Sequence, residues 1–440
     1  MSRRNFILTV IILFIVVLIL LGFMYFNRGE PTDPNDPNGG GNFFSSWNPF
    51  SPKPTPEGDT PIPTPDYENL PPEELAEMKL KKISTMPIAG FGIFLKERLK
   101  EVLVQEEEVD GEEIAPLSQL ILPETEFVTA VRYVEKENGI IYQTFADKIK
   151  ESRFSSTVIP RIYEAFFGSR SEIVVMRYLQ TDDETIETFV GTLPKEFVDV
   201  EPRDDNEIKG TFLPENTTEV AISADGNKIF YLFNSGLGTI GTTLEFLNNR
   251  KTQVFDSAFT EWLPWWPNNN MITLNTKPSA TVPGYLYKLD LNNKNNTQIL
   301  GDIAGLTTLM SPSGKTVLYA GGDLLLSLYN VDSREVIPLA LRTLPEKCVW
   351  TPDEVYIYCA VPKNTSLGFY PDIWYQGGVS FDDQLWRINV SDLSTLLILN
   401  PTSEVNGEEI DMTRLSLDEN RNYLFFMNKK DSFLWEFDLR

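Results

Sequence analysis

The sequence predicts an all-β chain whose larger part folds as a β-propeller, most simply with seven blades. One observation is a phrase that recurs along the chain: a strand, a polar tight turn, and a second strand rich in β-branched and aromatic residues. Another is its spacing, because turn positions Ala224, Pro267, Pro312 and Pro352 lie 43, 45 and 40 residues apart. That spacing is typical of a four-stranded blade. After Ile83, moreover, no long stretch has helical periodicity.

The repeated phrase supplies the first two strands of a blade, and an alternating third strand and a fourth strand complete it. Copies of the phrase stand at 221–231, 266–274, 310–319, 350–358 and 417–426, with an upstream relative at 165–175. Counting such units predicts blades at about 91–150, 151–200, 210–257, 258–303, 304–341, 342–401 and 402–440. The first two blades are poorly marked, so six or eight blades stay open beside seven.

The last blade lacks a fourth strand of its own, because the chain stops directly after a third strand. Residues 82–91 resemble 298–306, a passage that runs from a fourth strand into the next blade. We therefore predict that residues 81–85 pair onto the last blade and close a propeller that spans 83–440. Closure removes the bare sheet edges that an open ring would expose.

The first residues predict an uncleaved membrane anchor. Residues 6–26 carry no charge and, as a helix rising about 1.5 Å per residue, would span a hydrocarbon core of about 30 Å. Arg3 and Arg4 precede this run, which predicts that residues 1–5 form a cytoplasmic tip and that the propeller is exported. A cleaved signal peptide is the alternative, but the apolar run is long and ends without a small-residue cleavage site.

Two further segments separate the anchor from the propeller. Residues 27–72 are rich in Pro and Gly and predict a disordered linker that holds the domain away from the membrane. Residues 73–82 predict a short helix and lead-in, since Pro stands at the start, Glu follows in the first turns and Lys comes last.

Composition excludes several classes of function. Lys and Arg total 38 against 63 Asp and Glu, a net charge of −25, which argues against binding to nucleic acid or to anionic lipid headgroups. The chain has no histidine, which removes His-based nucleophilic catalysis and the usual zinc sites. We expect no catalytic residue, no metal site and no cofactor. The acidic clusters at 182–184 and 204–207 lack the ligand alternation of a calcium loop.

The only cysteines, Cys348 and Cys359, lie on the two arms of one predicted hairpin. Disulfides persist in exported domains. A four-residue turn would pair position 348 with 357, so a bond requires a longer turn or a bulge. The sequence therefore leaves open a disulfide or two buried thiols.

Two long connections between second and third strands, at 277–284 and 363–383, should emerge on the same face of the ring, because strands alternate in direction. Long loops on a common face indicate a binding surface. The second loop supplies the candidate binding residues Tyr370, Asp372, Trp374, Tyr375 and Gln376. The alternative is a loop that folds its aromatic side chains over the blade edge.

Trp262, Trp265 and Trp266 form a second aromatic group, on a predicted innermost strand. Alternation along the strand suggests that some of them fill space between blades. The competing interpretation is a platform on which a sugar ring stacks.

The repeat resembles the TolB-like and WD-repeat-like propeller repeats of bacterial envelope proteins, best at Ser-Ala-Asp-Gly 223–226 and Ser-Pro-Ser-Gly 311–314. The layout of anchor, linker and propeller resembles single-pass membrane proteins of candidate-phylum bacteria, with similar passages at 157–165, 344–350 and 374–378. The resemblance implies a propeller fold and an envelope location, and it carries over no catalytic residue.

We therefore expect a membrane-anchored, extracytoplasmic propeller that binds an envelope protein or a surface polymer as a scaffold or receptor. The alternative is a glycan-active enzyme that uses a carboxylate pair, since that chemistry needs no histidine. Carboxyl groups about 5–10 Å apart in a central pocket would favour the enzyme.

Overall fold

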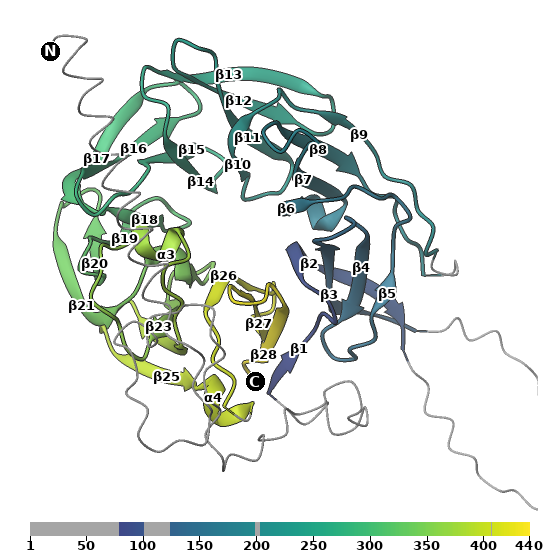
Figure 1. Cartoon of the computed structure of the whole chain (residues 1–440). Coiled ribbons are helices and arrows are strands. Elements are labelled where there is room, and N and C mark those ends of the chain that lie inside the picture. The colour runs from purple at the N-terminus through teal and green to yellow at the C-terminus, as the bar shows by residue number, and fades with distance from the viewer. Residues whose placement is uncertain (1–78, 101–123, 199–202, 406) are drawn as a thin grey trace, which may run out of the picture. The chain divides into compact units, whose positions relative to one another are not determined.

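Seven four-stranded antiparallel sheets follow one another along the chain and stand around a central axis (Figure 1). The computed structural model describes residues 79–100, 124–198, 203–405 and 407–440. In each sheet the strand that comes first in the blade lies nearest the axis (Figure 1). The all-β, seven-bladed propeller predicted from the repeat is therefore confirmed.

The first four blades follow the chain in order. Blade 1 contains β2 (Ile88–Leu99), β3 (Thr125–Glu135), β4 (Ile141–Phe145) and β5 (Ser152–Arg153). Blade 2 contains β6 (Ile162–Gly168), β7 (Ile173–Leu179), β8 (Ile186–Thr192) and β9 (Lys209–Phe212), with the short turn η3 (Ser169–Ser171). Blade 3 contains β10 (Thr217–Ile222), β11 (Lys228–Asn234), β12 (Thr239–Glu245) and β13 (Arg250–Ser257). Blade 4 contains β14 (Trp262–Asn268), β15 (Met271–Thr276), β16 (Pro283–Asp290) and β17 (Asn296–Ala304).

The last three blades carry the short helical elements that bear on the site. Blade 5 contains β18 (Thr307–Met310), β19 (Thr316–Ala320), β20 (Leu325–Asn330) and β21 (Val336–Arg342), followed by η4 (Pro345–Lys347). Blade 6 contains β22 (Cys348–Trp350), β23 (Tyr356–Pro362), β24 (Asp383–Asn389) and β25 (Thr395–Leu399), with α3 (Asp372–Tyr375) inserted and α4 (Pro401–Glu404) after it. Blade 7 contains β26 (Met412–Leu417), β27 (Tyr423–Asn428), β28 (Leu434–Asp438) and β1 (Leu80–Lys82).

The repeated phrase forms the turn between the first two strands because its side chains bond to its own backbone. Asp225 Oδ1 accepts the Asn227 N–H at 3.0 Å and Ser223 Oγ accepts the Lys228 N–H at 2.9 Å, while Gly226 takes a positive φ of 70°. Gly314 repeats this backbone at φ 76°, and Glu354 adopts it at φ 58° in blade 6. The residues of the phrase therefore determine the turn locally, which explains why the phrase can be recognised in the sequence of successive blades.

The ring closes through β1, which is the outermost strand of blade 7. Leu80 is opposite Phe437 and Lys82 is opposite Trp435 in the antiparallel pairing with β28. The Ile83 N–H continues the ladder by donating to the Leu434 carbonyl oxygen at 2.8 Å. The predicted closure is confirmed, and its strand begins one residue earlier than the predicted segment.

The predicted helix at 73–82 is wrong in its last three residues, which are the strand β1. Leu80 is buried in the core and bonds in a sheet, so tertiary pairing overrides the helical charge pattern. The rest of that segment lies outside the described residues.

The hydrophobic core lies between neighbouring blades rather than at one centre. Leu318 and Leu328 of blade 5 pack with Trp350 and Ile357 of blade 6. Between blades 7 and 1, the buried residue Phe425 belongs to a similar cluster. Each blade therefore buries its faces against its two neighbours, which makes the closed ring the unit of stability.

Strand direction divides the ring into two faces. We call the loop face the one that carries the connections between second and third strands and between blades, and the turn face the opposite one. The described chain starts and ends on the turn face, where Lys79 Nζ donates to the carbonyl oxygen of Arg440 at 2.8 Å. In blade 1, which carries no copy of the repeated phrase, residues 100–124 connect β2 and β3.

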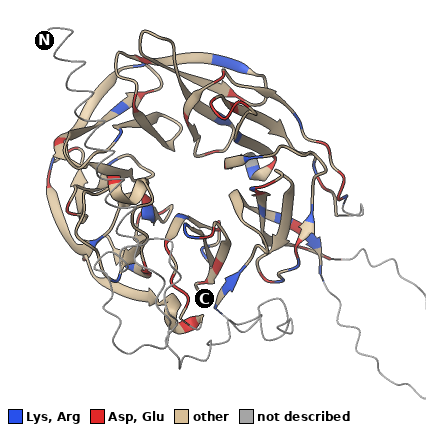
Figure 2. Ribbon diagram, viewed as in Figure 1, with Lys and Arg blue, Asp and Glu red and all other residues tan. Residues whose placement is uncertain are grey.

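The predicted tip (1–5), anchor (6–26) and linker (27–72) lie outside the described residues. Within the described part, no helix is long and apolar enough to cross a membrane. Lys and Arg alternate with Asp and Glu around the described ring (Figure 2).

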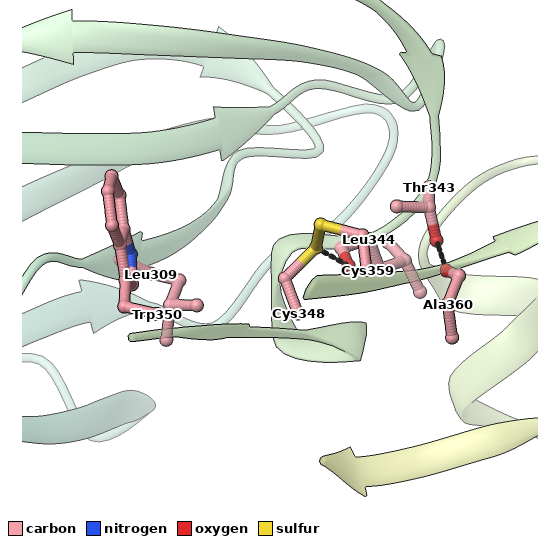
Figure 3. The surroundings of a disulfide bond; sticks show 7 residues. All are labelled: Leu309, Thr343, Leu344, Cys348, Trp350, Cys359 and Ala360. Atoms are coloured by element: carbon pink, nitrogen blue, oxygen red, sulfur yellow. Dashed lines mark hydrogen bonds between the residues drawn. A yellow bond between two sulfur atoms is a disulfide. The ribbon is translucent and has the colours of Figure 1, made fainter. Parts of the chain in front are cut away.

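The two cysteines form a disulfide in blade 6 (Figure 3). Cys348 and Cys359 are directly opposite each other on β22 and β23, with Cα atoms 4.1 Å apart. The turn is longer than the tight turn considered above, because the Thr351 N–H donates to the Tyr356 carbonyl oxygen at 2.9 Å. Both cysteines are buried, so the bond joins the two innermost strands of the blade from within its core.

Candidate binding site

The insertion between β23 and β24 folds back onto the ring instead of projecting into solvent. Tyr370 and Trp374 are both buried, at 4% and 6% exposure, and pack with Phe381. The ring centroids of Trp374 and Phe381 are 6.3 Å apart in a stacked arrangement. For Tyr370 and Trp374 the structure therefore favours the alternative interpretation, in which the loop folds its aromatic side chains onto the blade and they become part of the fold.

Trp374 is the anchor of this insertion. Its Nε1–H donates to Asp411 Oδ2 at 3.0 Å, and its carbonyl oxygen accepts from Lys429 Nζ at 2.5 Å. The ammonium of Lys429 also lies 4.3 Å from the indole centroid, in a cation–π contact. The predicted role of Trp374 as a surface contact residue needs correction, since its side chain supports the insertion.

Asp372 and Gln376 have different surroundings. Asp372 Oδ2 accepts the N–H of Ala280 at 2.6 Å and so joins the insertion of blade 6 to the long connection of blade 4. The Gln376 N–H donates to the Asp372 carbonyl oxygen and ends α3, while its side chain is exposed. The two long connections therefore meet on the loop face, as their strand directions predicted.

Tyr375 is the exposed aromatic residue of α3, with 36% of its surface exposed. Its hydroxyl donates to Glu346 Oε1 at 2.6 Å. Loss of hydration at the cavity wall and this neighbouring carboxylate together raise the pKa of Tyr375 well above its ordinary value.

A cavity of about 490 Å³ opens beside these residues along the central axis. Its walls come from the innermost strands of blades 4 to 7, and Pro278, Trp374 and Tyr375 border it on the loop face. Its polar and charged lining side chains include Thr307, Thr413, Arg414, Glu346 and Lys429. This size and mixed lining suit a small molecule or the end of a polymer.

Of the three tryptophans of β14, two pack in the core between blades and one is exposed in the cavity. Trp262 and Trp266 are buried, at 5% and 4% exposure, and belong to the core between blades. Trp265 is 49% exposed and lines the cavity. It is therefore the free aromatic surface that the site offers to a ligand.

A charged network stands on the side of the axis formed by blades 2, 3 and 7. The guanidinium groups of Arg177 and Arg414 both contact Glu164, one on each carboxylate oxygen. Arg177 Nη2 also donates to the carbonyl oxygens of Thr217 and Thr218, at 2.9 and 2.7 Å. Arg414 is both part of this network and part of the cavity wall, so it links the two.

Sequence reasoning missed Glu164, Glu219 and Arg414. The strand pairing shifts register at or next to each of them, between Ile162 and Glu164 in β6, Thr217 and Glu219 in β10, and Thr413 and Ser416 in β26. Such bulges re-aim a side chain. The available signal was a charged residue within a strand expected to be innermost.

Glu346 in the cavity wall and Glu219 on the innermost strand β10 carry raised pKa values. Desolvation raises the pKa of the half-buried Glu219 and that of Glu346, whose side chain is exposed to the cavity, to about 7 each. The folded state therefore binds more protons than the unfolded state between pH 4.5 and about 7. The stability that these groups contribute is present at low pH and is lost as the pH rises through 7.

We predict that the Glu219→Gln/Glu346→Gln variant flattens this pH dependence. The free energy of unfolding of the unmodified protein should fall from pH 5 to pH 8 by more than that of the variant, because Gln does not ionise. Urea unfolding at the two pH values measures the difference. Equal slopes in both proteins would contradict the prediction.

Among the described residues, no group of three or more His, Cys, Asp or Glu side chains is arranged to hold a metal ion. In the acidic cluster at 182–184, Asp182 accepts hydrogen bonds from the backbone of Glu184 and Thr185 and so forms a turn.

Known proteins resemble this chain in structure but not in sequence. No protein-family model matches the chain, and no curated protein matches it in sequence. TolB from Acinetobacter baumannii aligns with a TM-score of 0.37 and 8% identity, over 69% of this chain and 60% of that one. An oligogalacturonate lyase in complex with manganese aligns with a TM-score of 0.44 and 8% identity, over 71% of this chain and 85% of that one. An oligogalacturonate lyase from Vibrio parahaemolyticus aligns with a TM-score of 0.47 and 9% identity, over 71% of this chain and 86% of that one. The chain thus spans less than two thirds of the length of TolB, and these similarities concern the fold alone.

Proposed function

We propose that this chain is a membrane-tethered, extracytoplasmic propeller that binds an envelope protein or a surface polymer in the cavity on its loop face. The observation that carries the proposal is the half-exposed indole of Trp265 inside a cavity with charged walls. An aromatic surface surrounded by a few convergent polar groups is typical of a recognition site.

The direction of β1 supports the proposed arrangement. The chain enters the ring at residue 79 on the turn face, and β1 then runs toward the loop face. A tether at residues 27–72 and an anchor at 6–26 would therefore attach on the turn face.

We predict that Trp265→Ala lowers ligand capture by tenfold or more, the approximate loss expected when an aromatic anchor is truncated. The measurement is a cross-linked pull-down from native envelopes with the full chain as bait, together with a panel of purified surface polymers. The exposed indole has no packing role of the kind that Trp262 and Trp266 have, so the fold should persist.

Phe127→Ala is the matched control, because Phe127 is 66% exposed and does not border the cavity. Its capture should equal that of the unmodified protein. Equal capture by the Trp265→Ala variant would place the binding surface elsewhere.

The second candidate function is a glycan-active enzyme. The observation that favours it is Glu346 in the cavity wall, since a carboxyl group with a pKa near 7 suits a general acid. Incubation of the full chain with surface polysaccharides should then release new reducing ends, and Glu346→Gln should abolish the release. Capture without release supports the binding protein.

A further inference from the structure

A lysine and two aspartates are enclosed together at the junction of blades 6 and 7. Lys347 ends η4, Asp383 begins β24, and Asp411 directly precedes β26. All three side chains have an exposure of 0%. Lys347 Nζ lies 2.7 Å from Asp383 Oδ2 and contacts Asp411 Oδ1. Three segments far apart in the sequence thus meet at one amine.

The surroundings of the amine are aromatic. Nζ lies 5.2 Å from the indole centroid of Trp374 and 5.1 Å from the ring centroid of Phe381. An ion pair at such a site costs much of its attraction in lost hydration, and here two carboxyl groups face one amine. If the lysine and an aspartate lost their charges, the free energy lost with their hydration would be recovered.

The carboxyl group of Asp411 is polarised from one side. Its Oδ2 atom accepts the Trp374 Nε1–H and the Phe381 N–H, each at 3.0 Å, and the Ser380 hydroxyl at 3.2 Å. Three donors on one oxygen form the arrangement that stabilises the oxyanion of a tetrahedral intermediate. Oδ1, the other oxygen, is the one that faces Lys347.

Asp383 is placed to carry a proton. Its Oδ2 atom accepts the Met412 N–H at 2.7 Å, whereas its buried Oδ1 atom has no hydrogen-bond partner among the described residues. Burial raises the pKa of Asp383 to about 6. Burial also acts to raise the pKa of Asp411, but Lys347 and the donors on Oδ2 outweigh it and lower that pKa. Two carboxyl groups with separated pKa values are suited to different roles in proton transfer.

We propose that Lys347 and Asp411 become joined by an amide bond between Nζ and Cγ, formed by the folded chain itself with Asp383 as the proton shuttle. The inference is independent of the proposed function, because it concerns a covalent modification inside the propeller wall. The reactants are held in contact by the fold, which supplies the high effective concentration that such a bond needs.

The reaction balances without any co-reactant. Asp383 donates its proton to Asp411 Oδ1 and takes one from the ammonium of Lys347, which leaves a neutral amine. The Nζ lone pair then forms a bond to Cγ of Asp411, and the charge on Oδ2 is held by its three donors. Asp383 passes a second proton from nitrogen to Oδ1, the Cγ–Oδ1 bond breaks, and one water leaves. Asp383 ends as it began, and nothing is oxidised or reduced.

The bond would fasten the start of blade 7 to the start of blade 6. Lys347 is followed directly by Cys348, so the amide and the disulfide would hold β22 from two sides. Blade 7 is also where β1 closes the ring. A cross-link there would restrain blade 7 beside the closure.

Tryptic digestion of the reduced and alkylated full chain tests the proposal by mass spectrometry. An amide on Lys347 blocks cleavage there and joins residues 343–363 to residues 388–414 in one branched peptide. Its mass should be that of the two linear segments minus one water molecule. Recovery of residues 343–347 and 388–414 as separate peptides from folded protein would overturn the proposal.

Two variants test the chemistry. Lys347→Arg keeps the charge but cannot form this amide, so the branched peptide should be lost. Asp383→Asn should leave the two segments separate, and persistence of the branched peptide would overturn the role of Asp383. Asp382→Asn is the matched control, because Asp382 pairs with Lys363 outside the cluster, and it should stay linked. Circular dichroism checks that each variant is folded, and the result on the unmodified chain stands whether or not a variant folds.

Discussion

Deletion of residues 79–86 should leave the propeller without a stable folded state. The deletion removes β1, which pairs with the outer edge of β28, together with the buried side chains of Leu80 and Ile83. Truncation of a buried Leu or Ile alone costs about 2–5 kcal/mol, and the total stability of a domain is only about 5–15 kcal/mol. The exposed edge of β28 would also invite aggregation.

The measurements are soluble yield, size-exclusion elution and a thermal melt followed by circular dichroism. The matched control is a deletion of residues 53–60, which has the same length and falls in the predicted linker. That control should elute and melt like the unmodified chain. A 79–86 deletion variant with an unchanged melting temperature would show that the ring does not depend on β1.

The closure of the ring by β1 was predictable because the repeat that marks the blades depends on neighbouring residues. The repeat consists of turn residues such as Ser223, Asp225 and Gly226, which form hydrogen bonds to the backbone of the same turn and need no distant partner. The fourth strand of blade 7 could be located because residues 82–91 resemble the passage 298–306, which runs from a fourth strand into the next blade. The same locality explains why the boundaries predicted for blades 3 to 7 follow the observed sheets. The poorly marked first two blades were bounded wrongly, since β5 and most of β9 lie in the segments predicted for the blades after theirs.

The cavity was not predictable, because it exists only once four blades stand around the axis. Trp265 and Trp266 are adjacent in sequence, yet one lines the cavity and the other is core. Alternation indicates that they point in opposite directions but not which of them faces the axis. Glu219 and Arg414 depend in addition on bulges, which single-sequence patterns do not reveal.

The insertion of blade 6 shows how composition misleads. Aromatic residues beside glycine are typical both of recognition loops and of loops that fold onto a core. What separates the two is the partner of each polar tip: the indole of Trp374 donates to buried Asp411, and the hydroxyl of Tyr375 donates to Glu346 beside the cavity. Those partners are 37 and 29 residues away in the chain.

Trp374→Ala should therefore destabilise the propeller instead of only removing a contact with a ligand. Truncation of a buried Trp costs about 3–5 kcal/mol. The variant also removes one of the three donors on Asp411 Oδ2 and the ring beneath the ammonium of Lys429. Urea unfolding followed by circular dichroism should show a lower midpoint with a similar slope.

Tyr375→Phe is the matched control, since the two residues are neighbours in α3 and the change removes one hydroxyl. It should cost about 1 kcal/mol or less, because its hydrogen bond to Glu346 is formed at an exposed side chain. If the Trp374→Ala variant unfolded at the same urea concentration as the unmodified protein, the insertion would not be held by its indole. Trp374 would then again be a candidate for direct contact with the ligand. A large loss for Trp374→Ala and a small one for Tyr375→Phe would leave Tyr375 and Trp265 as the aromatic contacts of the cavity.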